Sequence, residues 1–247
     1  MDGYFPLDTG RRRTLKAAIG CVGVGLHSGR RVSLVLRPAP AGAGIRFLRT
    51  DIGLEVAARF DNVVDTRLCT ALGSADKPGQ TIATVEHVMA ALAGCGVDDA
   101  LVEVDGPEVP ILDGSALEFV QLLDRAGFRR QPSPVRYIEM LQTIHVEEGD
   151  KHAALRPCDR YEMRMEIDFP SAAIGNQVVD FVVDEATFRK EIMAARTFGF
   201  AHEVEALRRA GLARGGSLEN AVVIDGDQIL NPGGLRMERE FVRHKAL

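Results

Sequence analysis

The order in which strand-like and helix-like segments follow one another constrains the fold of this chain most strongly. Alternating apolar and polar residues, as in 32–36, predict strands before position 81, and helical patterns follow at 81–94 and 115–127. After residue 134 the order repeats, with strand patterns at 135–146, 151–157 and 161–169. Strands followed by helices in both halves predict an α+β fold, in which two similar sheet-plus-helix domains form a sandwich, each with a small insert.

The segment 131–134 (QPSP) is the predicted boundary between the two halves. It places two prolines in a short polar stretch, and proline disfavours regular structure in the residue before it. We therefore expect a first α+β domain at 1–132 and a second at 133–247, incomplete at its C-terminus.

Charge, cysteine content and hydropathy exclude several classes of protein. A net charge of −5 and a pI near 5.7 argue against a nucleic-acid partner. The 4 cysteines include no Cys-x-x-Cys pair, which favours reduced thiols in a cytoplasmic protein. The N-terminus lacks a signal-peptide pattern, and no apolar run approaches the roughly 20 residues of a membrane span. Any membrane contact is therefore expected to be peripheral.

The stretch 81–94 places two reactive groups on a predicted helix. Thr81 or Thr84 is expected to cap its start, and Gly94 to close its end in a left-handed conformation. Glu86 and His87 are neighbours, so their side chains point about 100° apart around the helix axis. This suits a metal ligand next to a general base, whereas the alternative is a solvated Glu–His pair on an amphipathic helix.

The glycine-rich run 23–29 (GVGLHSG) predicts a tight hairpin. It lacks the Lys-Ser/Thr of a phosphate-binding P-loop and the full glycine spacing of a dinucleotide fold. His27 lies within it and, on this pattern alone, is expected at the surface.

Five short motifs occur together and in order, namely GVGLHSG at 23–29, TVEH at 84–87, PILDGS at 110–115, RTFGF at 196–200 and FVRHK at 241–245. In this combination the chain resembles the UDP-3-O-acyl-N-acetylglucosamine deacetylases, zinc amidases of lipid A synthesis in Gram-negative bacteria. The resemblance extends from Arg13 to Leu247. It implies a cytoplasmic, monomeric enzyme, acting at the inner face of the inner membrane, whose substrate is UDP-3-O-acyl-N-acetylglucosamine.

The resemblance also implies roles for individual residues. His87 and His244 match two zinc ligands, Glu86 matches the general base, and Thr197 matches a hydroxyl that helps to hold the oxyanion. The substrate-binding positions implied in the same way are Lys245 at a phosphate, Asp168 and Phe169 at uracil, Phe198 and Phe200 along the sugar and acyl region, and His27 beside an acyl passage that also involves residues near 206–217.

One departure from the family pattern concerns the metal site. The family's third zinc ligand is an Asp four residues after the ligand His, and from His244 that step falls one position beyond Leu247. The family's catalytic His lies further on. We therefore expect a C-terminally truncated deacetylase that binds zinc weakly and turns over poorly. The alternatives are a truncated, inactive paralogue that binds UDP-sugar or acyl chains, and a two-domain scaffold with incidental histidines.

Overall fold

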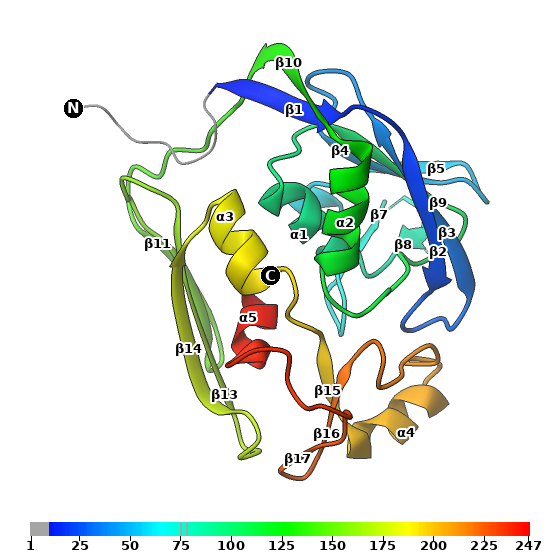
Figure 1. Cartoon of the computed structure of the whole chain (residues 1–247), viewed down its shortest axis with the longest axis vertical. Helices are drawn as coiled ribbons and strands as arrows, with labels where there is room; N and C mark the ends of the chain where they lie inside the picture. Colours follow the sequence, from blue (N-terminus) through cyan, green and yellow to red (C-terminus); the bar gives the residue numbers. More distant parts are fainter. Residues whose placement is uncertain (1–9, 75, 78) are drawn as a thin grey trace.

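The computed structural model describes residues 10–74, 76–77 and 79–247 and has an α+β architecture (Figure 1). Its largest sheet has the strand order β2-β3-β9-β4-β5. These strands are β2 (Ile19–Val24), β3 (Arg31–Pro38), β4 (Ile45–Arg49), β5 (Leu54–Ala57) and β9 (Ala100–Val104). All neighbours in this sheet are antiparallel except β4 and β9, which run parallel.

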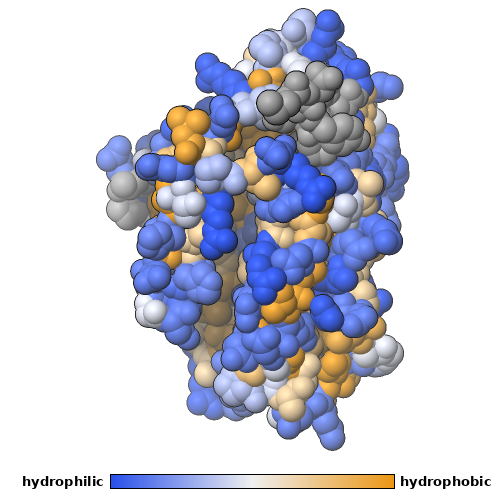
Figure 2. Space-filling view, turned by 90° about the vertical axis from the view of Figure 1, so that its left-hand side faces the viewer, coloured by the Kyte–Doolittle hydropathy of each residue, from blue (hydrophilic) through white to orange (hydrophobic). Residues whose placement is uncertain are grey.

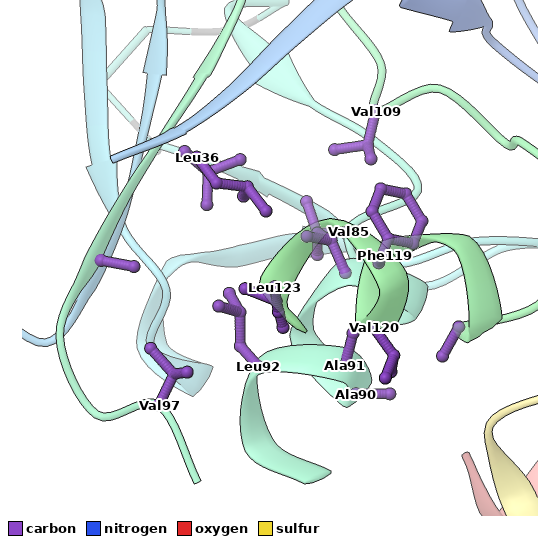
Figure 3. Packing of buried hydrophobic residues seen from close by; sticks show 14 of the residues in the cluster. Leu36, Val85, Ala90, Ala91, Leu92, Val97, Val109, Phe119, Val120 and Leu123 are labelled. Carbon is purple, nitrogen blue, oxygen red and sulfur yellow. The ribbon is translucent and has the colours of Figure 1, made fainter. Parts of the chain in front are cut away.

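Two helices, α1 (Glu86–Gly94) and α2 (Leu117–Ala126), cover the apolar face of this sheet. Leu36 of β3, Leu92 of α1 and Phe119 of α2 are fully buried members of one apolar cluster (Figure 3). The alternation of buried and partly exposed residues along β9 follows from the two-residue period of a strand with one face on the core. This packing makes α1 a rigid support for the residues of its first turn.

Smaller sheets flank this core. One sheet pairs β1 (Arg11–Leu15) with β10 (Phe128–Pro134). Another has the order β6-β7-β8, formed by β6 (Val63–Asp65), β7 (Ala71–Gly73) and β8 (Thr81–Ile82). A short 3-10 turn, η1 (Phe60–Asn62), precedes β6. In the second half, β11 (Ile144–Glu148) pairs with β12 (Lys151–Leu155), β13 (Glu162–Phe169) pairs with β14 (Gly175–Val182), and β15 (Phe198–Phe200), β16 (Val222–Asp225) and β17 (Gln228–Ile229) form a third sheet.

The helices of the second half are short. They are α3 (Glu185–Thr187), continuing into a π-helical turn η2 (Phe188–Ile192), then α4 (Ala201–Arg209) and α5 (Glu240–Ala246). Helix α5 lies between the β13–β14 hairpin and the first-half helices (Figure 1). The opposite face of this hairpin carries the exposed residues Glu162, Arg164 and Glu166, and that side of the molecule is largely hydrophilic with apolar patches (Figure 2).

The two halves share one continuous core. Val242 and Ala246 of α5 belong to the same buried cluster as the residues of α1 and α2. Phe188 of η2 packs against Gly94 at the end of α1, so closely that a Cβ atom at position 94 would overlap the phenyl ring. Glycine at this position therefore allows the second half to approach α1.

The hairpin predicted at 23–29 is confirmed, since it joins β2 to β3 and the Gly25 amide donates to the Arg30 carbonyl at 2.9 Å. The predicted start of the helix at 81 is wrong. Thr81 and Ile82 pair with β7 as strand β8, and Thr84 has a φ of 58°, so helical geometry begins only at Glu86. The left-handed residue after the helix is Gly96, with φ of 63°, rather than Gly94.

Two expectations for the middle of the chain also differ from the structure. Residues 131–134, predicted to be a linker, lie in β10, because they pair with β1 despite their prolines. The strand predicted at 135–146 begins only at Ile144. No helix in the described part of the chain combines the length and the apolar character needed to cross a membrane.

Candidate functional site

His87 and His244, from opposite halves of the chain, lie against each other. Their ring centroids are 5.2 Å apart and the ring planes are inclined by 76°. His87 is buried in the first turn of α1, whereas His244 is half-buried in α5. The structure therefore brings together the two residues predicted to be metal ligands.

Each imidazole has a defined environment. His244 Nδ1 lies 3.0 Å from the carbonyl oxygen of Ala195, a contact that orients the ring and leaves its Nε2 on the other side. His87 Nδ1 is buried without a hydrogen-bond partner among the described residues. A buried polar atom without a partner is costly, so this nitrogen is suited to bind an ion.

Both rings are held in the neutral form that binds metals. Burial, followed by the nearby His244 ring, lowers the pKa of His87 to about 3. Burial also lowers the pKa of His244 to about 4, although the Ala195 carbonyl opposes this change. At neutral pH neither ring carries the proton that would have to leave before coordination.

The two imidazoles fit a metal ion. Two rings that share a tetrahedral ion at about 2.0–2.1 Å from nitrogen have centroids roughly 5 Å apart, as observed here. The described residues nevertheless bring together no group of three or more His, Cys, Asp or Glu side chains that could hold a metal. The described residues therefore offer two imidazoles, whereas a catalytic zinc usually has three protein ligands.

Glu86 opens α1 beside His87, and its carboxylate accepts a hydrogen bond from the Thr70 amide at 3.0 Å. Burial raises the pKa of Glu86 above its usual value of 4.5, and the Thr70 amide only partly offsets this. A carboxylate whose pKa is raised by burial is a better proton acceptor near neutral pH.

Helix α5 is held in place by a buried ion pair. The Glu240 carboxylate is fully buried and accepts hydrogen bonds from the Arg196 side chain at 2.8 Å and from the backbone amides of Arg196 and Arg236. Thr197 directly follows Arg196, and its amide donates to the Gly114 carbonyl at 2.8 Å. These contacts thus hold the segment before β15, which carries Thr197, against α5, which carries His244.

An aromatic cluster extends from His244 toward the β13–β14 hairpin. The centroid of the Phe198 ring lies 6.4 Å from that of His244 and 5.6 Å from that of Phe169. The Lys245 ammonium lies 5.6 Å from the Phe198 ring centroid. Phe200 is 6.0 Å from Phe169. The structure therefore groups four of the predicted substrate-binding residues beside the histidine pair.

A cavity of about 310 Å³ opens at the far end of this cluster, lined by Phe169, Phe200, His202 and neighbouring residues. Asp168, predicted with Phe169, is exposed at the end of β13, opposite Asn176. It does not line this cavity.

His27 lies in the hairpin loop between β2 and β3, against residues 213–215, which follow α4. The backbone around it binds residues 214 and 215, with the Gly215 amide donating to the Leu26 carbonyl at 2.9 Å. Its Nε2 atom is buried and has no partner among the described residues. The expectation of a surface residue is thus too simple, because His27 is half-buried against the insert.

Sequence reasoning missed the residues that hold this site together. Arg196 lies in one of the five motifs, but neither its position nor that of Glu240 predicts the ion pair that they form. Buried acidic residues have no local sequence pattern, so only their partners in the folded chain identify them.

Two neutral imidazoles beside a half-buried carboxylate, carried on an α+β scaffold, are typical of a metal-assisted hydrolase. The model of one protein family, LpxC: UDP-3-O-acyl N-acetylglycosamine deacetylase, matches residues 12–247. The chain belongs to this family of deacetylase enzymes.

Individual relatives agree with this assignment. A protein of Phenylobacterium zucineum named UDP-3-O-acyl-N-acetylglucosamine deacetylase is 56% identical over 239 residues, which cover 96% of this chain and 81% of the relative. Proteins of the same name from Anaeromyxobacter dehalogenans and Myxococcus xanthus are 49% and 50% identical, covering 96% of this chain and 76% and 75% of their own lengths.

Proposed function

We propose that this protein hydrolyses the N-acetyl group of UDP-3-O-acyl-N-acetylglucosamine, releasing acetate and UDP-3-O-acyl-glucosamine, in the synthesis of lipid A. The observation that carries the proposal is the approach of His87 to His244, beside Glu86, in a chain whose relatives bear the name of this deacetylase. The proposal places the activity in a monomer in the cytoplasm, at the inner face of the inner membrane, where an acylated substrate is accessible.

In the proposed mechanism His87 and His244 would hold a zinc ion. Such an ion would act as a Lewis acid and lower the pKa of a water molecule toward about 7. Glu86 accepts the proton of the attacking water, for which its raised pKa suits it, and returns a proton to the amine nitrogen as the C–N bond breaks. The Thr197 hydroxyl donates to the carbonyl oxygen of the acetyl group as negative charge develops there.

The remaining residues hold the substrate in this proposal. Lys245 pairs with a phosphate, and Phe198 and Phe200 line the sugar and acyl region. Phe169 lines a cavity that offers space for the uracil, and Asp168 binds the base from the exposed end of β13. His27 borders the acyl passage, supported by its position against the 213–215 segment.

We also propose that the two halves, 1–132 and 133–247, are similar sheet-plus-helix domains that face each other as a sandwich. Support comes from α1 and α2 on the five-stranded sheet and α5 on the β13–β14 hairpin. The β15–β16–β17 unit with α4 is the proposed insert of the second half.

The test is hydrolysis by the purified, zinc-supplemented chain, with acetate and the free amine measured by mass spectrometry. We expect the variants His87→Ala and His244→Ala to lose both activity and bound zinc, while His152→Ala, on the exposed strand β12, keeps both. Retention of metal in the first two variants contradicts the proposed site. Tight UDP-sugar binding in calorimetry without zinc and without acetate release favours a binding paralogue instead.

A further inference from the structure

Glu108 is a buried carboxylate to which the proposed mechanism assigns no role. It is 2% exposed and lies between β9 and α2. Its Oε1 accepts hydrogen bonds from the His27 amide and the Thr84 hydroxyl, and its Oε2 accepts one from the Ser28 amide, each at 2.9 Å. No cationic side chain forms an ion pair with it in the described ranges, so these donors replace its hydration.

One set of these contacts reaches the start of α1. Thr84 has a φ of 58°, a conformation that a β-branched residue rarely adopts unless its surroundings impose it. The Ala83 amide donates to the Pro107 carbonyl and the Val109 amide to the Ala83 carbonyl, at 2.9 and 3.0 Å. Backbone and side-chain contacts of the Glu108 segment together hold Thr84, which lies two residues before Glu86.

The flanking residues anchor this contact in the core. Val85 and Val109, which follow Thr84 and Glu108, are both buried in the apolar cluster (Figure 3). Neither segment can therefore shift without disturbing the packing against Phe119 and its neighbours.

The second set of contacts holds the hairpin loop that carries His27. A Cβ atom at Gly25 would overlap the Glu108 carboxylate and the Ser28 hydroxyl, so glycine is needed for the loop to close over Glu108. On its other side the loop binds residues 214 and 215 of the insert. One carboxylate thus links the loop beside the proposed acyl passage to the residue that leads into Glu86.

We propose that Glu108 is a positioning residue for the deacetylation. Through Thr84 it fixes the position of Glu86, and through the amides of His27 and Ser28 it fixes the hairpin loop beside the proposed acyl passage. This inference rests on the proposed function, since it assigns Glu86 to proton transfer. Glu108 itself touches neither substrate nor metal in this proposal.

The kinetic test uses two variants that remove different contacts. In Glu108→Gln one acceptor oxygen becomes an NH2 group that faces either the His27 or the Ser28 amide. The loss of charge also weakens the hydrogen bond from the Thr84 hydroxyl, so both sets of contacts weaken. We expect kcat to fall and KM to rise, with a combined loss in kcat/KM of up to about 100-fold, because a 1 Å misplacement of a catalytic group can cost that much. Thr84→Val removes only the hydroxyl, so we expect a smaller fall in kcat, of about 10-fold, with KM unchanged. Thr84→Ser keeps the hydroxyl and should restore kcat.

The matched control is Glu103→Gln on β9, whose carboxylate pairs with Arg37 at 2.7 Å on the sheet surface. Its kinetic constants should equal those of the unmodified protein. If Glu108→Gln and Thr84→Val keep the original kcat and KM and lower only the melting temperature, Glu108 is merely structural and the inference is overturned. If Glu108→Gln does not fold, the difference in kcat between Thr84→Val and Thr84→Ser tests the inference by itself, and equal kcat values overturn it.

A measurement without substrate separates this inference from the proposed function. Hydrogen exchange of the 25–29 and 84–88 segments should be faster in Glu108→Gln than in the unmodified protein, because the protecting carboxylate contacts are weakened. Unchanged exchange in both segments overturns the inference. If exchange is faster in Glu108→Gln but the unmodified protein releases no acetate, the proposed function is rejected. Glu108 then remains the residue that links the hairpin loop to the start of α1.

Discussion

Arg196 and Glu240 form a buried ion pair that joins the segment carrying Thr197 to the helix carrying His244. The guanidinium Nε lies 2.8 Å from Glu240 Oε1, and the two side chains are 8% and 0% exposed. The pair joins positions 44 residues apart in the chain and holds α5 where His244 meets His87.

Glu240→Gln should destabilise the protein strongly. It keeps the shape of the side chain but leaves the Arg196 charge buried without a counter-charge, which typically costs about 3–5 kcal/mol. Urea unfolding followed by circular dichroism measures the change. The matched control is Glu205→Gln, whose exposed partner is Arg209 in α4 and which should change stability by less than about 0.5 kcal/mol. Equal effects of the two variants contradict the buried-pair argument.

The same pair predicts a pH dependence of stability. Burial raises the pKa of Glu240, but hydrogen bonds from Arg196 outweigh it and the pKa ends below the usual 4.5. A carboxylate whose folded pKa is lowered contributes stability above its unfolded pKa and loses it as the pH falls through the folded pKa. We therefore expect the free energy of unfolding to fall below pH 4.5, and less steeply in Glu240→Gln, where this group no longer titrates.

Gly94→Ala should destabilise the protein although alanine favours helices by about 1 kcal/mol. The new methyl group would overlap the Phe188 ring at the contact between α1 and η2, and such overpacking costs about 1–3 kcal/mol. Thermal unfolding of Gly94→Ala alone and combined with Phe188→Leu tests this, because the smaller side chain should recover part of the loss. Gly199→Ala, where a methyl group meets nothing within 4 Å, is the control.

Glu86→Gln should abolish proton acceptance while preserving the fold. The amide oxygen can still accept the Thr70 hydrogen bond, so stability should change little. General-base loss typically lowers kcat by about 10²–10⁴-fold. Acetate release under saturating substrate, together with unchanged zinc content, measures this; a variant with more than half of the original kcat would exclude Glu86 as the base.

Lys245→Gln should weaken substrate binding more than chemistry. The ammonium is exposed beside Phe198 and is proposed to pair with a phosphate, so we expect KM for the UDP-linked substrate to rise about 10-fold, the effect of losing one charged hydrogen bond of about 1.5 kcal/mol. Arg243→Gln, two residues earlier and paired with Glu191, is the comparison and should leave KM closer to its original value. Equal KM changes in both variants would indicate a general charge effect.

Local patterns predicted much of the fold. The alternation in β3 and the glycines at 23–29 predicted a strand and a hairpin that the structure confirms. The helix around Glu86 was also predicted, but its start was wrong, because pairing of Thr81 with β7 and the Glu108 contact to Thr84 override helix propensity. Strand pairing between β1 and β10 likewise overrides the turn preference of prolines in 131–134.

The amino-acid sequence by itself determined which groups are available: an acid and a histidine adjacent on a helix, a second histidine near Leu247, and the motifs shared with one family. Only the tertiary structure decided that the two rings lie 5.2 Å apart and that Glu240 and Glu108 hold the segments around them. The physical reason is that helix and strand periodicity act over a few neighbouring residues, whereas a buried carboxylate finds its donors wherever packing brings distant segments together.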